Sequence, residues 1–76
     1  MIYTLRNQDN EFVKEIDTAN KKLIFTTDPN EAINYCTRMG GGEWNANNEK
    51  EFIQFHFKEL GDKVSTLSIY TIENYI

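Results

Sequence analysis

Few side chains in this chain could carry out chemistry. The 76 residues include one histidine and one cysteine, His56 and Cys36. His56 is the natural candidate for a general base at neutral pH, and Cys36 for a thiolate nucleophile. Both fall on apolar faces of predicted helices, where a histidine is usually a partly buried packing residue and a cysteine packs like a small hydrophobe. An enzyme built on this pair is the least favoured hypothesis.

Metal and phosphate sites are not indicated either. One histidine and one cysteine are too few for a structural zinc site, which takes four ligands. Gly40-Gly41-Gly42 could suggest a phosphate loop, but we expect these glycines to end a helix rather than to open one, and Glu43 would repel an anion. We therefore predict no catalytic residues, no metal and no cofactor.

The segment that follows the glycines is a better candidate for binding. Residues 40–47 are predicted to form a flexible loop that carries the single tryptophan, Trp44. Tryptophan is enriched among interface hot spots because it buries a large area at a small entropic cost. We predict that Trp44 anchors a protein partner, and that Glu43, Asn45 and Asn47 surround it. The alternative is that Trp44 folds back over the core as a lid.

Charge and length limit the kind of partner. Eight Lys and Arg stand against twelve Asp and Glu, which gives a net charge of −4. A nucleic-acid binder normally has a basic surface, so direct nucleic-acid binding is not expected, whereas an acidic surface favours a basic protein partner. No apolar run approaches the ~20 residues needed to span a bilayer. With an unpaired cysteine and no pattern of a signal peptide, we expect a cytoplasmic protein.

The first half of the chain predicts an antiparallel meander followed by a helix. Residues 2–6 are rich in β-branched and aromatic side chains, and residues 11–16 and 22–27 carry apolar side chains on both faces. Polar turn clusters separate the three segments, as expected of strands. Asp28 and Glu31 then have the spacing of a helix cap with proline at the first helical position. We expect a helix from Pro29 to about Met39, stopped by Gly40.

The second half is less distinct. Residues 48–60 could be a strand or a helix; we favour a helix that starts at a cap on Asn48 and buries Phe52, Ile53, Phe55, Phe57 and Leu60 on one broad side. Residues 64–72 predict a final strand that joins the sheet. Its apolar side chains on both faces indicate an interior strand or an edge strand covered by a partner. Residues 73–76 predict a tail that frays. The result is one α+β domain over residues 1–76, with the order β-β-β-α-α-β.

Two sequence segments resemble those of small accessory proteins encoded by phages and prophages of Gram-positive bacteria. They are Ile2-Tyr3-Thr4-Leu5 with its polar turn, and Phe25-Thr26-Thr27-Asp28-Pro29-Asn30-Glu31-Ala32, a strand that leads into a helix cap. The resemblance covers residues 1–36 and assigns no functional residue. It implies a small protein that binds and blocks a host protein, such as a defence nuclease, in the cytoplasm of an infected bacterium.

These observations together favour a non-enzymatic protein-binding module. Its partner would be a host protein with a basic surface, held through Trp44 and its neighbours. The alternative is a structural or assembly protein that forms a homo-oligomer, most simply a homodimer, through the final strand, because an apolar edge strand can pair with its own copy across a two-fold axis.

Overall fold

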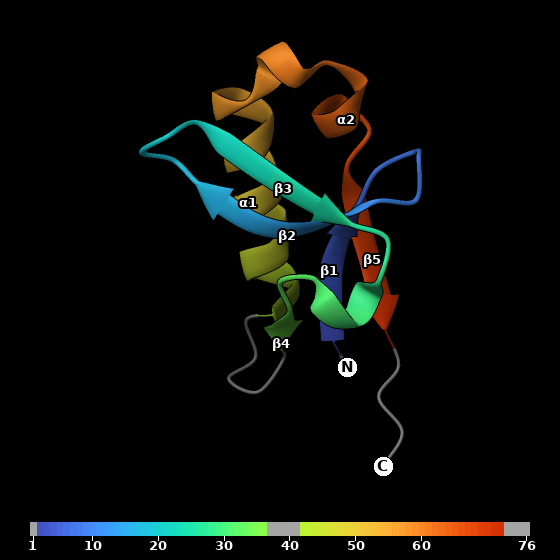
Figure 1. The fold of residues 1–76 in the computed structure, drawn as a ribbon. Coiled ribbons are helices and arrows are strands. Elements are labelled where there is room, and N and C mark those ends of the chain that lie inside the picture. The colour runs from blue at the N-terminus through green and yellow to red at the C-terminus, as the bar shows by residue number, and fades with distance from the viewer. Residues whose placement is uncertain (1, 37–41, 73–76) are drawn as a thin grey trace.

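The computed structural model describes residues 2–36 and 42–72 and is a small α+β fold, as predicted (Figure 1). Its strands, all antiparallel, are β1 (Ile2–Arg6), β2 (Phe12–Asp17), β3 (Lys22–Thr26), the two-residue β4 (Tyr35–Cys36) and β5 (Ser68–Ile72). Its helices are α1 (Gly42–His56) and α2 (Asp62–Ser65), with 3-10 turns η1 (Pro29–Glu31) and η2 (Lys58–Leu60).

Strand β1 organises the sheet. It pairs with β5 along its whole length, from Ile2 opposite Ile72 to Arg6 opposite Ser68. On its other side, β4 pairs with the start of β1 and β2 with its end, where Arg6 lies opposite Phe12. The meander of β1, β2 and β3 is therefore present, and the predicted final strand joins the sheet as β5. The short strand β4 was not predicted.

Helix α1 packs against β1, β4 and β5. Strand residues alternate between the two faces of a sheet, so Leu5 of β1 points to the helix while Thr4 points away. The core on this side consists of Leu5, Val13, Ala46, Ile53, Phe57, Val64 and Leu67. In α1, Ala46 and Ile53 are fully buried, which fixes the face that the helix turns toward the sheet.

The face of the sheet away from α1 is held by aromatic contacts. The rings of Phe12 and Tyr70 meet edge to face with centroids 5.3 Å apart, and the Arg6 guanidinium lies 4.4 Å from the centre of the Tyr70 ring. On the opposite face of β5, Ile69 packs against the core. Tyr70 and Ile69, on the two faces of the final strand, thus have partners within the chain. Assembly through that strand stays a prediction.

The helix predicted from Pro29 to Met39 is wrong as far as the structure describes it. The cap is present, since the Asp28 carboxylate accepts a hydrogen bond from the backbone N–H of Asn30. After one 3-10 turn, however, Ala32 is extended, and the Ile33 N–H donates to the carbonyl of Val13. Residues 33–35, Ile-Asn-Tyr, are weak helix formers, and Tyr35 gains a place beside β1 in β4.

The helix preferred for residues 48–60 is confirmed through His56, but its start is wrong. Helix α1 begins at Gly42, six residues before the expected cap, because extending it buries Ala46 against the sheet. Likewise, β5 starts at Ser68 rather than at residue 64, since residues 62–65 form α2. Gly61 joins the two helical segments with a φ of 65°, a backbone conformation that favours glycine.

The predictions for Met39, Gly40, Gly41 and the tail 73–76 lie outside the described residues. Within the two described ranges, no helix is long and apolar enough to cross a bilayer.

Candidate interaction surface on helix α1

Trp44 lies in the first turn of α1 and not in a loop. Its side chain is 69% exposed, so the alternative in which it folds over the core as a lid is wrong. A helix turns about 100° per residue, and Trp44 comes two residues before the buried Ala46, which places it on the side away from the sheet. A rigid helix, rather than a flexible glycine loop, therefore presents this ring to solvent.

Phe55 is the second large apolar side chain on the same side. It is 67% exposed and lies eleven residues, or about 16 Å, further along the axis of α1. Asn48 and Glu51 lie between the two rings and are both exposed. We call the four residues Trp44, Asn48, Glu51 and Phe55 the outer face of α1. An aromatic ring stands at each end of this face, and two polar side chains occupy its middle.

Phe52 and His56 widen the apolar end of the helix. The two rings are 4.3 Å apart, and the ring of Phe55 lies 5.0 Å from that of His56. The expected partial burial of His56 is wrong: it is exposed at the last residue of α1. Of the five residues predicted to be buried on one side, only Ile53 and Phe57 belong to the core. Phe52, Phe55 and Leu60 are exposed by 37%, 67% and 40%, so their predicted burial is wrong.

The other predicted binding residues lie around Trp44. Glu43 and Asn45 are exposed on either side of it, and the half-buried Asn47 donates a hydrogen bond to Glu51 at 3.2 Å. Glu43, in the first turn, also has the charge that stabilises a helix N-terminus. The sequence reasoning missed Asn48, Glu51 and Phe55. The sequence signal for these residues is their spacing: from Trp44, successive steps of four, three and four residues lead to Asn48, Glu51 and Phe55. This spacing places them on one side only if the helix begins at Gly42.

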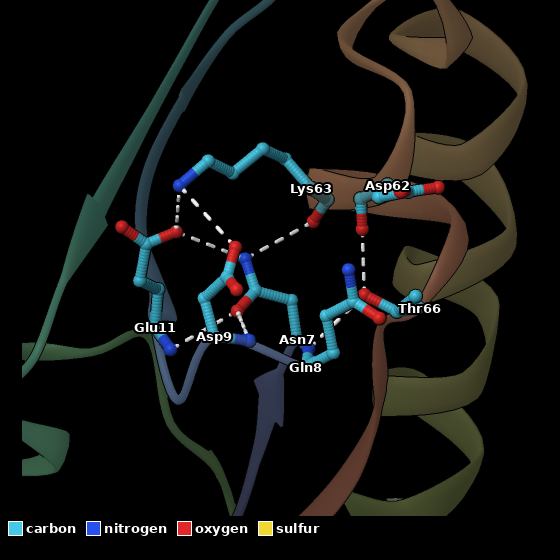
Figure 2. Close-up of polar contacts among 7 residues, drawn as sticks. All are labelled: Asn7, Gln8, Asp9, Glu11, Asp62, Lys63 and Thr66. Atoms are coloured by element: carbon cyan, nitrogen blue, oxygen red, sulfur yellow. Dashed lines mark hydrogen bonds and ion pairs between the residues drawn. The ribbon is translucent and has the colours of Figure 1, made fainter.

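A polar cluster ties the β1–β2 turn to α2 (Figure 2). The ammonium group of Lys63 lies 2.6 Å from Glu11 Oε1 and 3.6 Å from Asp9 Oδ2. Thr66 Oγ1 accepts a hydrogen bond from the Gln8 N–H and donates one to the carbonyl of Asp62. These contacts hold α2 and the start of β5, and through them the C-terminal end of α1.

Asn7 is the centre of this cluster. Its Oδ1 accepts hydrogen bonds from the backbone N–H groups of Asp9 and Glu11. Its Nδ2 donates to the carbonyl of Lys63 and to the Glu11 carboxylate. Hydrogen bonds from Lys63 and then from Asn7 lower the pKa of Glu11, and the same ion pair raises the pKa of Lys63. The cluster is structural, because its polar groups are satisfied by one another.

Elsewhere the described residues offer little for catalysis. No group of three or more His, Cys, Asp and Glu side chains in residues 2–36 and 42–72 could hold a metal ion. Cys36 belongs to β4 by its backbone, and its side chain is outside what the structure describes, so the paired Cys36–His56 hypothesis is not tested. An open pocket of about 380 Å³ lies between the end of α1 and α2, lined by Gln54, Lys58, Gly61, Asp62, Val64 and Ser65.

Comparisons with protein-family models, with curated proteins and with solved structures found no match to this chain.

Proposed function

We propose that this chain is a non-enzymatic protein-binding module that contacts its partner through the outer face of α1. The exposure of two aromatic rings, Trp44 and Phe55, on one line of a rigid helix carries the proposal. Tryptophan is among the side chains that most often dominate binding energy, and phenylalanine is enriched in interfaces relative to the rest of the surface. Three turns separate the two rings, so the matching site is an apolar groove on the partner long enough to take both.

The charge around these rings suggests the chemistry of the groove's rim. Helix α1 carries three glutamates and one lysine, and the whole chain has a net charge of −4. A partner with a basic rim would be attracted over a distance and oriented on approach. Together with the resemblance to phage and prophage accessory proteins, this supports a host protein in the bacterial cytoplasm that is blocked by occlusion of its groove.

The test is capture of a partner by tagged protein from the cytoplasm of a Gram-positive host, with three variants alongside. Trp44→Ala and Phe55→Ala each remove one ring of the outer face, whereas Ile24→Ala removes an exposed apolar side chain, 41% accessible, on β3. We expect a partner that wild type and Ile24→Ala capture and that the two α1 variants lose. Circular dichroism confirms that all four chains are folded.

The affinity of the purified protein for its captured partner tests the proposal quantitatively. Removing a hot-spot tryptophan costs about 2 kcal/mol or more, so Trp44→Ala should weaken binding by about 30-fold or more. Added salt should weaken it further, because the attraction to a basic rim is screened. Equal capture by wild type, Trp44→Ala and Phe55→Ala would overturn the proposal.

A further inference from the structure

The outer face of α1 has the spacing of a helix-pairing seam. Trp44, Asn48, Glu51 and Phe55 follow one another at intervals of four, three and four residues. These are the intervals between successive a and d positions of a heptad, which keep side chains on one line when two helices pack side by side. All four side chains are exposed, although Glu51 accepts a hydrogen bond from Asn47 and the Phe55 ring lies against His56 of the same helix.

The order of residues on this line is complementary to itself. The line is symmetric about the point midway between Asn48 and Glu51. If a second identical helix packs antiparallel across that point, Trp44 meets Phe55 of the second copy at each end. In the middle, Asn48 meets Glu51 of the second copy, so an amide that can donate a hydrogen bond lies opposite a carboxylate that can accept one. Each pairing occurs twice, as a two-fold axis requires.

We propose that the outer face of α1 docks antiparallel against the same face of a second copy of this chain. The inference rests on the proposed function, because it assigns a second use to the same surface. A copy docked in this way covers Trp44 and Phe55, so only the monomer can bind another partner. Self-association then regulates how much of the binding surface is available.

The area points to a weak dimer. A large aromatic ring buries at most about 150–250 Å², and only two such rings per copy lie on the line. The total therefore falls near or below the low end of stable interfaces, which bury about 1,200–2,000 Å². The polar pair in the middle adds orientation more than affinity, as a single polar residue does in the seam of a coiled coil. We expect association that depends on protein concentration.

Electrostatics separates this dimer from a complex with a basic partner. Two copies that each carry a net charge of −4 repel one another, and salt screens that repulsion. Added salt should therefore strengthen self-association, whereas it should weaken binding to a basic partner. The two uses of the surface have opposite salt dependences.

The test is sedimentation equilibrium of the full chain from low micromolar to millimolar concentration, at low and at high NaCl. We expect the wild-type mass to rise from the 8.9 kDa of one chain toward twice that value, and to rise further in high salt. Trp44→Ala and Phe55→Ala should stay monomeric over the same range. Ile24→Ala should behave as wild type does.

Two substitutions at Asn48 test the pairing itself. Asn48→Asp places a carboxylate opposite Glu51 of the second copy and should weaken association by about 10-fold or more, whereas Asn48→Lys should strengthen it by a similar factor. Asn20→Asp and Asn20→Lys make the same changes of net charge on an exposed turn and should have much smaller effects. The contrast between the two positions isolates the contact from the overall charge.

A mass of one chain at every concentration and salt would overturn the inference, and so would a dimer that Trp44→Ala and Phe55→Ala leave intact. No other protein is present in this experiment. A monomeric result therefore leaves the proposed capture of a partner standing, and failure to capture a partner leaves the dimer standing.

Discussion

Asn7 shows how a single buried amide can hold two distant segments together. Its side chain is 3% exposed and makes four hydrogen bonds, two within its own turn and two that reach Glu11 and the carbonyl of Lys63. Residues 7 and 63 are joined in this way although most of the chain separates them. The sequence marks Asn7 only as one of several polar turn residues.

We predict that Asn7→Ala lowers the free energy of unfolding by about 1–3 kcal/mol, because it removes four hydrogen bonds and leaves part-buried polar groups without this partner. Urea denaturation measures the change. Asn20→Ala is the matched control: Asn20 also donates from its side chain to a carboxylate, that of Asp17, but on an exposed turn. It should cost no more than about 0.5 kcal/mol. Similar losses for both variants would mean that the Asn7 cluster contributes no more to stability than an exposed turn does.

At the scale of the element, α1 has two faces with opposite roles. Phe57, just after its end, is 1% exposed and belongs to the core, while Phe55 stands in solvent. The two phenylalanines are two residues apart in sequence and point to opposite sides. Stability should therefore depend on one of them and binding on the other.

We predict that Phe57→Ala destabilises the fold by about 3–5 kcal/mol, since it removes a large buried ring and leaves a cavity. That loss is comparable with the whole stability expected of a domain of this size, so the variant should be largely unfolded at room temperature. Phe55→Ala should change the free energy of unfolding by less than about 1 kcal/mol. Thermal unfolding followed by circular dichroism compares them, and a larger loss for Phe55→Ala would reverse the assigned orientation of α1.

At the scale of the whole molecule, some of the excess acidic side chains form ion pairs with lysine. Lys63 pairs with Glu11 and Asp9, and the pKa of Glu11 is lowered mainly by the hydrogen bond from Lys63. A carboxyl whose pKa is lower in the folded state contributes stability above its unfolded value. That contribution is lost as the pH falls through the folded value.

We predict that the midpoint of thermal unfolding falls as the pH is lowered below the ordinary glutamate value of 4.5, and that it falls less steeply in Lys63→Met. Removing the ammonium returns the pKa of Glu11 toward its ordinary value, so less stability is left to lose on acidification. Lys22→Met, at an exposed position on β3, makes the same change of net charge and should keep the wild-type slope. Parallel curves for wild type and Lys63→Met would contradict the linkage.

The sequence by itself determined the local features of this protein. Short apolar segments between polar turn clusters located β1, β2 and β3, because strand propensity and turn chemistry act within a few neighbouring residues. The cap at Asp28 was predicted for the same reason. The order of the predicted strands and helices indicated the α+β class, and the single tryptophan was singled out by composition.

The tertiary structure decided everything that depended on contacts between distant segments. The chain does not continue as a helix after the cap at Asp28, and Tyr35–Cys36 form β4 because a place beside β1 is available to them. Helix α1 extends back to Gly42 because Ala46 is buried against the sheet. That extension sets the angle at which Trp44 and Phe55 face solvent. Burial energy from across the fold outweighs propensities of a few tenths of a kcal/mol per residue, so the candidate surface could not be assembled from the sequence alone.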